Sequence, residues 1–332
     1  MIEILWDEIR TIHFTGIGGI GVSALARYYK KLEYKIQGSD LIENSVVKDI
    51  ADEGIFVFIG QEAKNIDKDI DLLIYSSAVP ETNPERMQAK KLGIQQYSYN
   101  EVLGLLSSQK RTIAISGTNG KTTTTAMAAL MLENAGLDIL ALVGSKVPQW
   151  NSNLRFGKGE YFIVEACEYQ AHMLTLSPEI IVLTNGGLAS CPSLQGIDDI
   201  IAHFQEYIDK LPEGGLLIYN IDDPNIAKLN WQDGKYRTLT FGIENEKADI
   251  SVDKYSVDSG TQDFWLTFYG DRHNRMKLHV PGKFNLYNAL AAACVGITLG
   301  LNKDQIKNGI GLFTGTWRRF EKFKEEDEII YI

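Results

Sequence analysis

A glycine-containing turn between an apolar run and a helical run is the feature that most constrains this chain. Residues 113–116 are typical of a buried β-strand, residues 117–123 read Gly-Thr-Asn-Gly-Lys-Thr-Thr, and residues 124–130 have helical periodicity. At a helix start, free backbone N–H groups converge on one point and the helix dipole adds partial positive charge there. The pattern therefore predicts a strand, a polyphosphate-binding loop and a helix.

Each residue type in this loop suits a polyphosphate guest. Gly117 and Gly120 let the backbone approach the phosphates, Lys121 can reach the terminal phosphates, and the Thr122 hydroxyl is placed to ligate Mg²⁺. The spacing is shorter than the usual Walker pattern, and an ordinary glycine-rich turn before a helix is the alternative interpretation. The residues expected to hold the polyphosphate in this loop are Gly117, Thr118, Asn119, Gly120, Lys121, Thr122 and Thr123.

Length and composition favour a globular protein of about two domains. The chain has 332 residues, of which 44% are hydrophobic, and no run approaches the ~18 apolar residues of a membrane span. The acidic start of the chain is unlike a signal peptide, so we expect a cytoplasmic location. A net charge of −10 argues against nucleic acid as the main partner. The three cysteines are far apart in sequence, which suggests neither a disulfide framework nor a zinc site.

A second glycine-rich turn lies near the N-terminus. The expected strand 11–15 leads into Gly16-Ile17-Gly18-Gly19-Ile20-Gly21, and a helix is expected over 22–31. After the next strand, Asp40 is placed to bind a ribose hydroxyl, so an NAD(P)-dependent oxidoreductase is one hypothesis. A nucleotide-phosphate site of another kind remains the competing one.

Polar residues follow three further expected strands. Ser76 and Ser77 follow strand 71–75, although a connection without ligand contacts would look the same. Glu165 and Glu168 follow strand 161–164, where carboxylates can hold Mg²⁺, with an acidic loop facing water as the alternative. A third strand, 180–185, leads into the small, uncharged loop 186–193. This alternation of strands and helices predicts an α/β fold with a mainly parallel sheet.

The last third of the chain adds three features. Short alternating runs between residues 238 and 280 predict an antiparallel β extension. Asn285 and Asn288 precede an alanine-rich helix expected over 289–299, where one can cap the helix and both can share a face. Arg319, beside Arg318, is a fitting partner for a γ-phosphate, with a surface pair as the alternative. The final residues resemble the beginning of a strand that has no partner after it, so we expect a further domain.

These motifs together resemble the Mur ligases. The resemblance covers nearly the whole chain, and six motifs carry it in the right order: His13–Gly19, Gly38-Ser39-Asp40, Ser76–Pro80 with Asn83-Pro84-Glu85, the loop at 117–123, Pro281-Gly282-x-x-Asn285-x-x-Asn288, and Gly315-x-x-Arg318-Arg319-Phe320. Within the family they are most similar to the ligases that join L-alanine to UDP-N-acetylmuramate.

The resemblance implies a domain organisation and a reaction. Residues 1–105 would form a Rossmann-like UDP-sugar domain, residues 106–317 a central ATPase domain, and residues 318–332 the start of a C-terminal domain. It implies ATP-dependent amide formation through an acyl phosphate, in peptidoglycan precursor synthesis, with Mg²⁺ bound by Thr122 and Glu165 and with Lys121 and Arg319 as catalytic residues. Asn285 and Asn288 would lie near the adenine. The residues expected at the UDP-sugar are Gly16, Gly18, Gly19, Asp40, Ser76 and Ser77.

The chain departs from the family pattern in ways that bear on activity. Asn119 stands where this branch of the family usually has His. Sister ligases have Asn at this position, as this chain does. The family's charged and metal-binding residues after the third strand fall on Gly187, Ala189, Ser190 and Pro192, and none of these is charged. We therefore expect binding of UDP-sugar, weaker binding of ATP and impaired ligation. The alternatives are a non-catalytic nucleotide-sugar module and a murein peptide ligase of the same family. Oligomeric state leaves no mark on the sequence.

Overall fold

The chain forms two compact units. The computed structural model describes residues 4–187, 196–231, 234–258, 260–317, 322–325 and 328–331. Residues 1–106 make up unit 1 and residues 107–332 unit 2. Among the described helices, none is both long and apolar enough to cross a membrane.

Unit 1 is built on a five-stranded parallel sheet of order β3-β2-β1-β4-β5. The order reverses direction at β1, because the chain adds β2 and β3 on one side of it and β4 and β5 on the other. Such a switch opens a crevice at the carboxyl ends of the strands. The strands are β1 (Thr11–Thr15), β2 (Lys35–Asp40), β3 (Phe56–Ile59), β4 (Leu72–Tyr75) and β5 (Gln95–Ser98).

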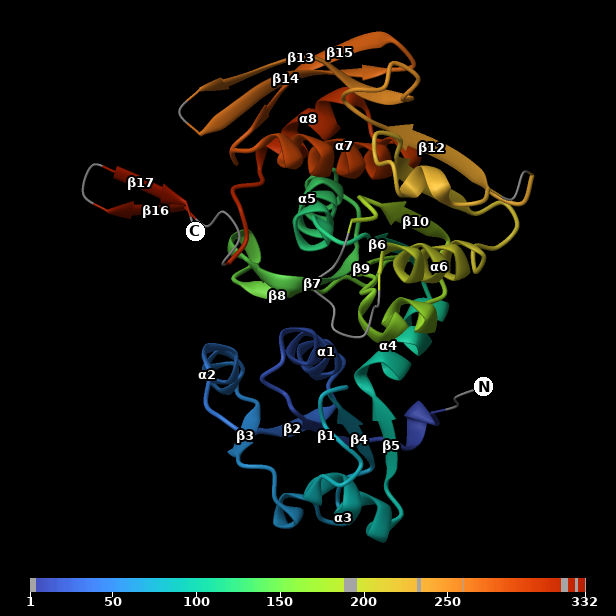
Figure 1. The fold of residues 1–332 in the computed structure, drawn as a ribbon. Helices are drawn as coiled ribbons and strands as arrows, with labels where there is room; N and C mark the ends of the chain where they lie inside the picture. The colour runs from blue at the N-terminus through green and yellow to red at the C-terminus, as the bar shows by residue number, and fades with distance from the viewer. Residues whose placement is uncertain are drawn as a thin grey trace. The chain divides into compact units, whose positions relative to one another are not determined.

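Helices cover both faces of this sheet, with α1 and α2 on one face and α3 on the other (Figure 1). Helix α3 begins where it does because the Asn83 side chain accepts from the backbone N–H groups of Glu85 and Arg86, and it ends at Gly93, which is left-handed. The helices and 3-10 turns of unit 1 are η1 (Trp6–Glu8), α1 (Ile20–Lys31), α2 (Ser45–Asp52), η2 (Ala63–Asn65), α3 (Pro84–Leu92) and α4 (Tyr99–Ser108), the last running across the unit boundary.

Unit 2 contains a ten-stranded sheet of order β15-β14-β13-β12-β11-β10-β6-β9-β7-β8. Strands β12, β11, β10, β6, β9 and β7 are parallel, and β8 is antiparallel to β7. Strand β13 pairs in parallel with β12 and begins the β13–β15 meander, whose strands are antiparallel to one another. The strands are β6 (Arg111–Ser116), β7 (Leu140–Val147), β8 (Ser152–Arg155), β9 (Tyr161–Glu165), β10 (Ile180–Leu183), β11 (Leu216–Asn220), β12 (Arg237–Phe241), β13 (Ile250–Asp258), β14 (Thr261–Phe268) and β15 (Asp271–Leu278). A separate hairpin joins β16 (Lys322–Glu325) to β17 (Glu328–Tyr331).

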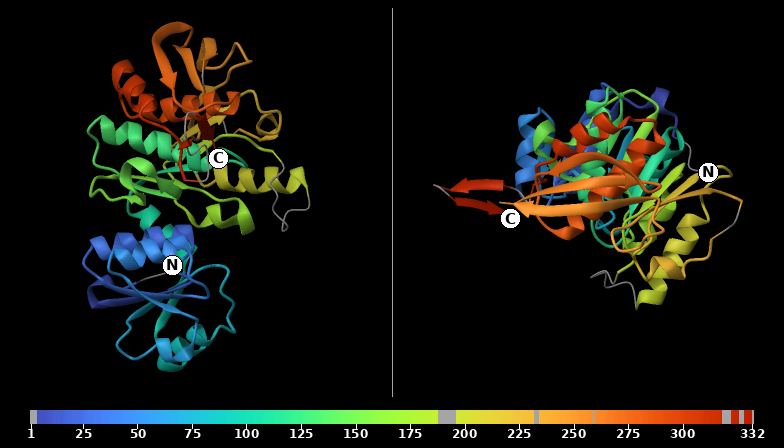
Figure 2. Two further views of the ribbon diagram at one scale, coloured as in Figure 1. Left: turned by 90° about the vertical axis from the view of Figure 1, so that its left-hand side faces the viewer. Right: turned by 90° about the horizontal axis from the view of Figure 1, so that it is seen from above.

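The helix after β6 lies at the centre of unit 2. Figures 1 and 2 show α5 beside α7, between the parallel strands and the antiparallel meander. Residues Thr122–Leu132 of α5 are all buried, and Gly309 of α8 packs directly on Met131. The helices and 3-10 turns of unit 2 are α5 (Lys121–Asn134), η3 (Pro148–Trp150), η4 (Tyr169–Thr175), α6 (Ile197–Ile208), η5 (Ile226–Lys228), α7 (Lys283–Thr298) and α8 (Lys303–Gly311).

The predicted α/β class, the mainly parallel sheet and the antiparallel extension are confirmed. One local prediction was wrong. Helix α7 begins at Lys283 with Gly282 as its N-cap, so Asn285 and Asn288 lie inside the helix and neither caps it. The strand expected near the end of the chain is present as β17, and it pairs with β16, which precedes it.

Candidate functional site

Three loops of unit 2 meet at the carboxyl edge of its sheet. Strand β6 lies between β10 and β9 and is parallel to both, so the segments that follow these strands emerge side by side. They are residues 117–120, 184–187 and 166–168. A ligand is expected at this edge of a parallel sheet, where the connections change direction.

The loop after β6 has the geometry of a phosphate cradle. Gly117 and Gly120 have φ angles of +126° and +84°, which L side chains rarely adopt. Helix α5 begins at Lys121, and none of the described side chains caps this end. The backbone N–H groups of the first turn, up to Thr123, are therefore directed at the space above the loop.

The Lys121 ammonium is held over this loop by three acceptors. Its Nζ donates to the carbonyl oxygens of Gly117 at 2.6 Å and Thr118 at 3.1 Å, and to Glu168 Oε2 at 2.7 Å. The side chains of Lys121 and Glu168 are 14% and 10% exposed. Because an ammonium has three N–H donors, these contacts occupy all of them.

A carboxylate and a hydroxyl also meet at the start of α5. Thr122 Oγ1 donates to Glu165 Oε2 at 2.9 Å, and the Gly144 backbone N–H donates to the second carboxylate oxygen. Mg²⁺ in nucleotide sites is usually held by one or two protein oxygens together with phosphates and water, so this pair fits the ion. Among the residues that the structure describes, no cluster of three or more His, Cys, Asp or Glu side chains is arranged for a metal.

Residues after β10 fix the shape of the phosphate loop. Asn185 Oδ1 accepts from the Asn119 backbone N–H at 2.9 Å, and Asn185 Nδ2 donates to the Asn119 carbonyl at 2.8 Å. Thr184 Oγ1 donates to the same carbonyl at 2.6 Å, and Thr118 Oγ1 donates to the Gly187 carbonyl at 2.6 Å. The role of Asn185 in positioning the loop had not been predicted from the sequence.

The two asparagines of α7 are buried beside the loop. Asn288 Oδ1 accepts from Thr124 Oγ1 at 3.3 Å, and Asn288 Nδ2 donates to Asn285 Oδ1 at 3.0 Å. Asn285 Nδ2 in turn donates to the Pro281 carbonyl at 2.7 Å. A Cβ atom on Gly120 would come within 2.3 Å of Asn288 Oδ1. Both residues thus support the phosphate loop, and their expected proximity to an adenine stays a prediction.

A neighbouring turn in the same unit is organised by Asp222. This carboxylate accepts from the backbone N–H groups of residues 243–245 and from Tyr287 Oη at 2.9 Å. Burial by itself raises the pKa of Asp222, but these donors outweigh it and hold the pKa below its usual value. Tyr287 belongs to α7, so the bond ties the start of that helix to the turn after β11.

In unit 1 the predicted residues gather at the carboxyl edge of the sheet. Gly18 donates its backbone N–H to Asp40 Oδ2 at 2.8 Å. Gly16 has a φ of +81°, and a Cβ atom there would come within 2.9 Å of Ser76 Cβ. Gly19 is the N-cap of α1, and Ser77 Oγ accepts from Asn100 Nδ2 at 2.8 Å. The glycine-rich turn, Asp40 and the serine loop therefore form one cluster.

A buried carboxylate lies beneath this edge, unassigned by the sequence analysis. Glu85 and His13 are fully buried, with His13 Nε2 3.2 Å from Glu85 Oε2. Thr15 Oγ1 and Ser39 Oγ donate to Glu85 Oε2 at 2.7 and 2.6 Å, and Asn65 Nδ2 donates to Oε1 at 2.7 Å. This network joins β1, β2, η2 and α3. It holds together the strands that carry the glycine-rich turn and Asp40.

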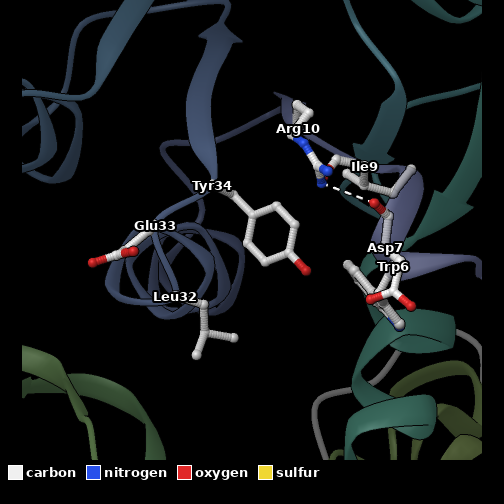
Figure 3. Close-up of a pocket in the computed structure, with 7 residues that line it drawn as sticks. All are labelled: Trp6, Asp7, Ile9, Arg10, Leu32, Glu33 and Tyr34. Atoms are coloured by element: carbon white, nitrogen blue, oxygen red, sulfur yellow. Dashed lines mark hydrogen bonds between the residues drawn. The ribbon is translucent and has the colours of Figure 1, made fainter.

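Unit 1 also has an open pocket of about 350 Å³, shown in Figure 3. It lies near the amino ends of β1 and β2, where Arg10 Nη1 donates to the Asp7 carbonyl at 2.8 Å. This is the opposite end of the strands from the glycine-rich turn. The lining residues are Trp6, Asp7, Ile9, Arg10, Leu32, Glu33 and Tyr34, and none of them was predicted as a site residue.

Two predicted features lie outside the described residues. One is Arg319 together with its neighbour Arg318, and the other is the part of the uncharged loop from residue 188 onward. Gly186 is described, and its backbone N–H donates to Asp223 Oδ2 at 3.1 Å.

Both units match known families. Residues 115–296 match the Mur ligase middle domain, and residues 11–111 match the model described as Mur ligase family, catalytic domain. The chain belongs to the Mur ligase family. This confirms the predicted recognition and, with it, the predicted class of ATP-dependent ligases.

Individual Mur ligases are similar to this chain over nearly its whole length. It is 36% identical over 320 residues to UDP-N-acetylmuramate--L-alanine ligase from Clostridium novyi and 34% identical over 318 residues to that from Aquifex aeolicus. Each match covers 96% of this chain and 69% of the relative. The structure of UDP-N-acetylmuramate-alanine ligase from Thermotoga maritima superposes with a TM-score of 0.83 at 27% identity, covering 98% of this chain and 73% of that one.

A further Mur ligase structure shares the fold. UDP-N-acetylmuramate:L-alanyl-gamma-D-glutamyl-meso-diaminopimelate ligase from Neisseria meningitides has a TM-score of 0.83 at 22% identity, covering 93% of this chain and all of that one. At this identity the likeness concerns architecture, so it does not distinguish between substrates.

Proposed function

We propose that this Mur ligase joins L-alanine to UDP-N-acetylmuramate at the expense of ATP. The relatives that are 34–37% identical to it carry the name of that reaction. The phosphate loop at the start of α5 supplies the groups that such a reaction needs at a triphosphate. The cytoplasmic location expected from the sequence is part of this proposal.

Each unit takes one substrate in this proposal. Unit 1 binds the UDP-sugar at the cluster of Gly16, Gly18, Gly19, Asp40, Ser76 and Ser77. Unit 2 binds ATP on residues 117–123, with Asn285 and Asn288 toward the adenine and Arg319 toward the γ-phosphate. The two glycine-rich turns then bind two different nucleotides, the UDP-sugar and ATP. An NAD(P) cofactor is therefore not needed to explain the turn in unit 1.

The proposed reaction has two steps. A carboxylate oxygen of the sugar nucleotide attacks the γ-phosphorus, and the bond from this phosphorus to the bridging β-phosphate oxygen breaks. ADP departs, and the sugar nucleotide now carries an acyl phosphate. The amine of L-alanine then attacks the acyl carbon, phosphate leaves with the bonding pair, and the nitrogen loses a proton. Mg²⁺ held by Thr122 and Glu165 would neutralise phosphate charge. Lys121 and the N–H groups of the first turn of α5 stabilise the negative charge on the transferred phosphoryl group.

The observation that carries the proposal is the arrangement of Lys121, Thr122 and Glu165 around the uncapped start of α5. Its test is release of phosphate from ATP by the purified protein with UDP-N-acetylmuramate, L-alanine and Mg²⁺. We expect release that depends on all three and that Lys121→Ala abolishes. Release without the sugar nucleotide, or unchanged release in Lys121→Ala, would contradict the proposal.

The uncharged loop 186–193 favours a second candidate, a protein that binds both nucleotides and turns over slowly or not at all. Removing charged groups beside a phosphoryl transfer site costs on the order of 10²–10³-fold in rate. Calorimetry with UDP-N-acetylmuramate distinguishes the two. Binding without phosphate release selects the non-catalytic module, whereas turnover of about 1–10³ s⁻¹ excludes impairment.

A further inference from the structure

We infer that Glu168 makes the phosphate loop selective for metal-bound nucleotide, by acting as a fixed counter-ion of Lys121. The inference rests on the proposed ATP site and adds a specificity residue to it. Glu168 would act through the lysine and through its own charge, so it is a positioning residue and takes no part in bond making.

The first support is the saturation of the Lys121 ammonium. Its three donors are used by two loop carbonyls and Glu168 Oε2. The carbonyl of Gly117 belongs to a tightly held turn, since a Cβ atom there would come within 2.2 Å of Thr184 Oγ1. A phosphate that recruits the ammonium must therefore displace or share the side-chain partner, Glu168.

The second support is that the backbone holds Glu168 in place. Its carbonyl accepts from the Ala171 N–H at 3.1 Å, and the neighbouring Cys167 carbonyl accepts from Met173 at 2.9 Å. Ala171 has a φ of +55°, a left-handed conformation that costs an alanine free energy and persists only where the surroundings enforce it. The backbone that carries the Glu168 carboxylate is therefore anchored beside the loop.

The third support is the local balance of charge. Two carboxylates, Glu165 and Glu168, face this loop against the one ammonium of Lys121. A metal-free triphosphate brings more negative charge than its magnesium complex, so it meets stronger repulsion from Glu168. The side chains of Lys121 and Glu168 are largely shielded from water, so solvent screens this repulsion only weakly.

The test compares binding of a non-hydrolysable ATP analogue by calorimetry, in Mg²⁺ and in EDTA. Glu168→Gln keeps an acceptor for Lys121 but removes the charge. We expect it to tighten metal-free binding about tenfold while magnesium-bound binding changes less than about threefold. Glu168→Asp keeps the charge and should show the same difference between magnesium-bound and metal-free affinity as the unchanged protein. If Glu168→Gln folds poorly, this variant still tests the inference, because loss of that difference in Glu168→Asp would contradict it.

A matched control is Glu160→Gln, which removes an exposed carboxylate next to the amino end of the same strand, β9. It should leave both affinities unchanged. Equal changes with and without Mg²⁺ in Glu168→Gln, or loss of discrimination in Glu168→Asp, would overturn the inference and leave the ATP site standing. Failure of the unchanged protein to bind the analogue under either condition would overturn the ATP site and this inference together.

Discussion

Asn288 of α7 lies directly against Gly120 of the phosphate loop, so closely that a Cβ atom on the glycine would come within 2.3 Å of the amide oxygen. The same oxygen accepts from Thr124 Oγ1 in the first turns of α5. A helix residue 164 positions beyond Thr124 in the chain therefore helps to set the shape of the phosphate loop.

This contact predicts an unequal cost for two glycine substitutions. Gly120 and Gly136 have similar φ angles, +84° and +90°, but apart from its chain neighbours none of the described residues comes within 4 Å of a Cβ on Gly136. Gly136→Ala should cost about 1 kcal/mol of unfolding free energy, from backbone strain alone. Gly120→Ala should cost about twice that or more, because it also displaces Asn288. Chemical denaturation measures both.

Removing the Asn288 side chain should make the two glycine substitutions equally costly in unfolding free energy. In an Asn288→Ala background, Gly120→Ala is expected to cost no more than Gly136→Ala does. A full extra cost in that background would mean that the contact with Asn288 is not what constrains Gly120.

The hydrogen bond from Thr122 to Glu165 marks the expected magnesium position. Thr122→Val preserves the size of the side chain but removes its oxygen, and should reduce magnesium-dependent nucleotide affinity by about 10–100-fold. Thr125→Val is the matched control, since the Thr125 hydroxyl donates to the Lys121 carbonyl within α5. Titration of Mg²⁺ at fixed nucleotide measures the effect. Equal magnesium dependence in the two variants would remove Thr122 from the metal site.

Stability in acid should depend on Glu85. Burial raises the pKa of Glu85, but hydrogen bonds from His13, Ser39 and Asn65 and the electrostatic interaction with His13 outweigh it, so the pKa lies below its usual value. A lowered folded-state pKa stabilises the protein above the unfolded pKa of about 4.3, and this contribution is lost as pH falls through the folded pKa.

We therefore expect Glu85→Gln to reduce the unfolding free energy by about 1–3 kcal/mol at neutral pH and by less in acid. Denaturation between about pH 3 and pH 7 gives the two curves. Glu43→Gln breaks an exposed pair with Lys48 and should change stability by less than about 1 kcal/mol. Parallel pH curves for Glu85→Gln and the unchanged protein would show that this carboxyl group titrates alike in both states.

The sequence predicted the parts of the site that are local in the chain. The loop from Gly117 to Thr123 is continuous, and its strand, turn and helix signals agree with one another. Parallel strand ends share an edge, so the placement of Glu165 and Glu168 beside this loop followed as well. Helix α7 began earlier than expected because Gly282, with a φ of +94°, takes the N-cap position that an asparagine had been expected to fill.

What the sequence left unpredicted depends on which strands and helices are neighbours. Glu85 and His13 are 72 residues apart, and their contact requires α3 to pack under β1. The two bonds between Asn185 and Asn119 require β10 to lie next to β6, a strand order that the periodicity of either segment does not encode. Such contacts combine ordinary residue types at unremarkable positions.

The pair formed by Asn185 and Asn119 leads to the last prediction. Asn185→Ala removes both bonds that hold the Asn119 peptide, at 2.9 and 2.8 Å. Each such bond contributes about 0.5–1.5 kcal/mol, so a loosened loop should bind nucleotide about tenfold more weakly. Asn225→Ala, on the nearby turn, loses a bond to Lys228 and should bind nucleotide normally. Calorimetry with an ATP analogue decides the matter, since equal affinities would show that the loop keeps its shape without Asn185.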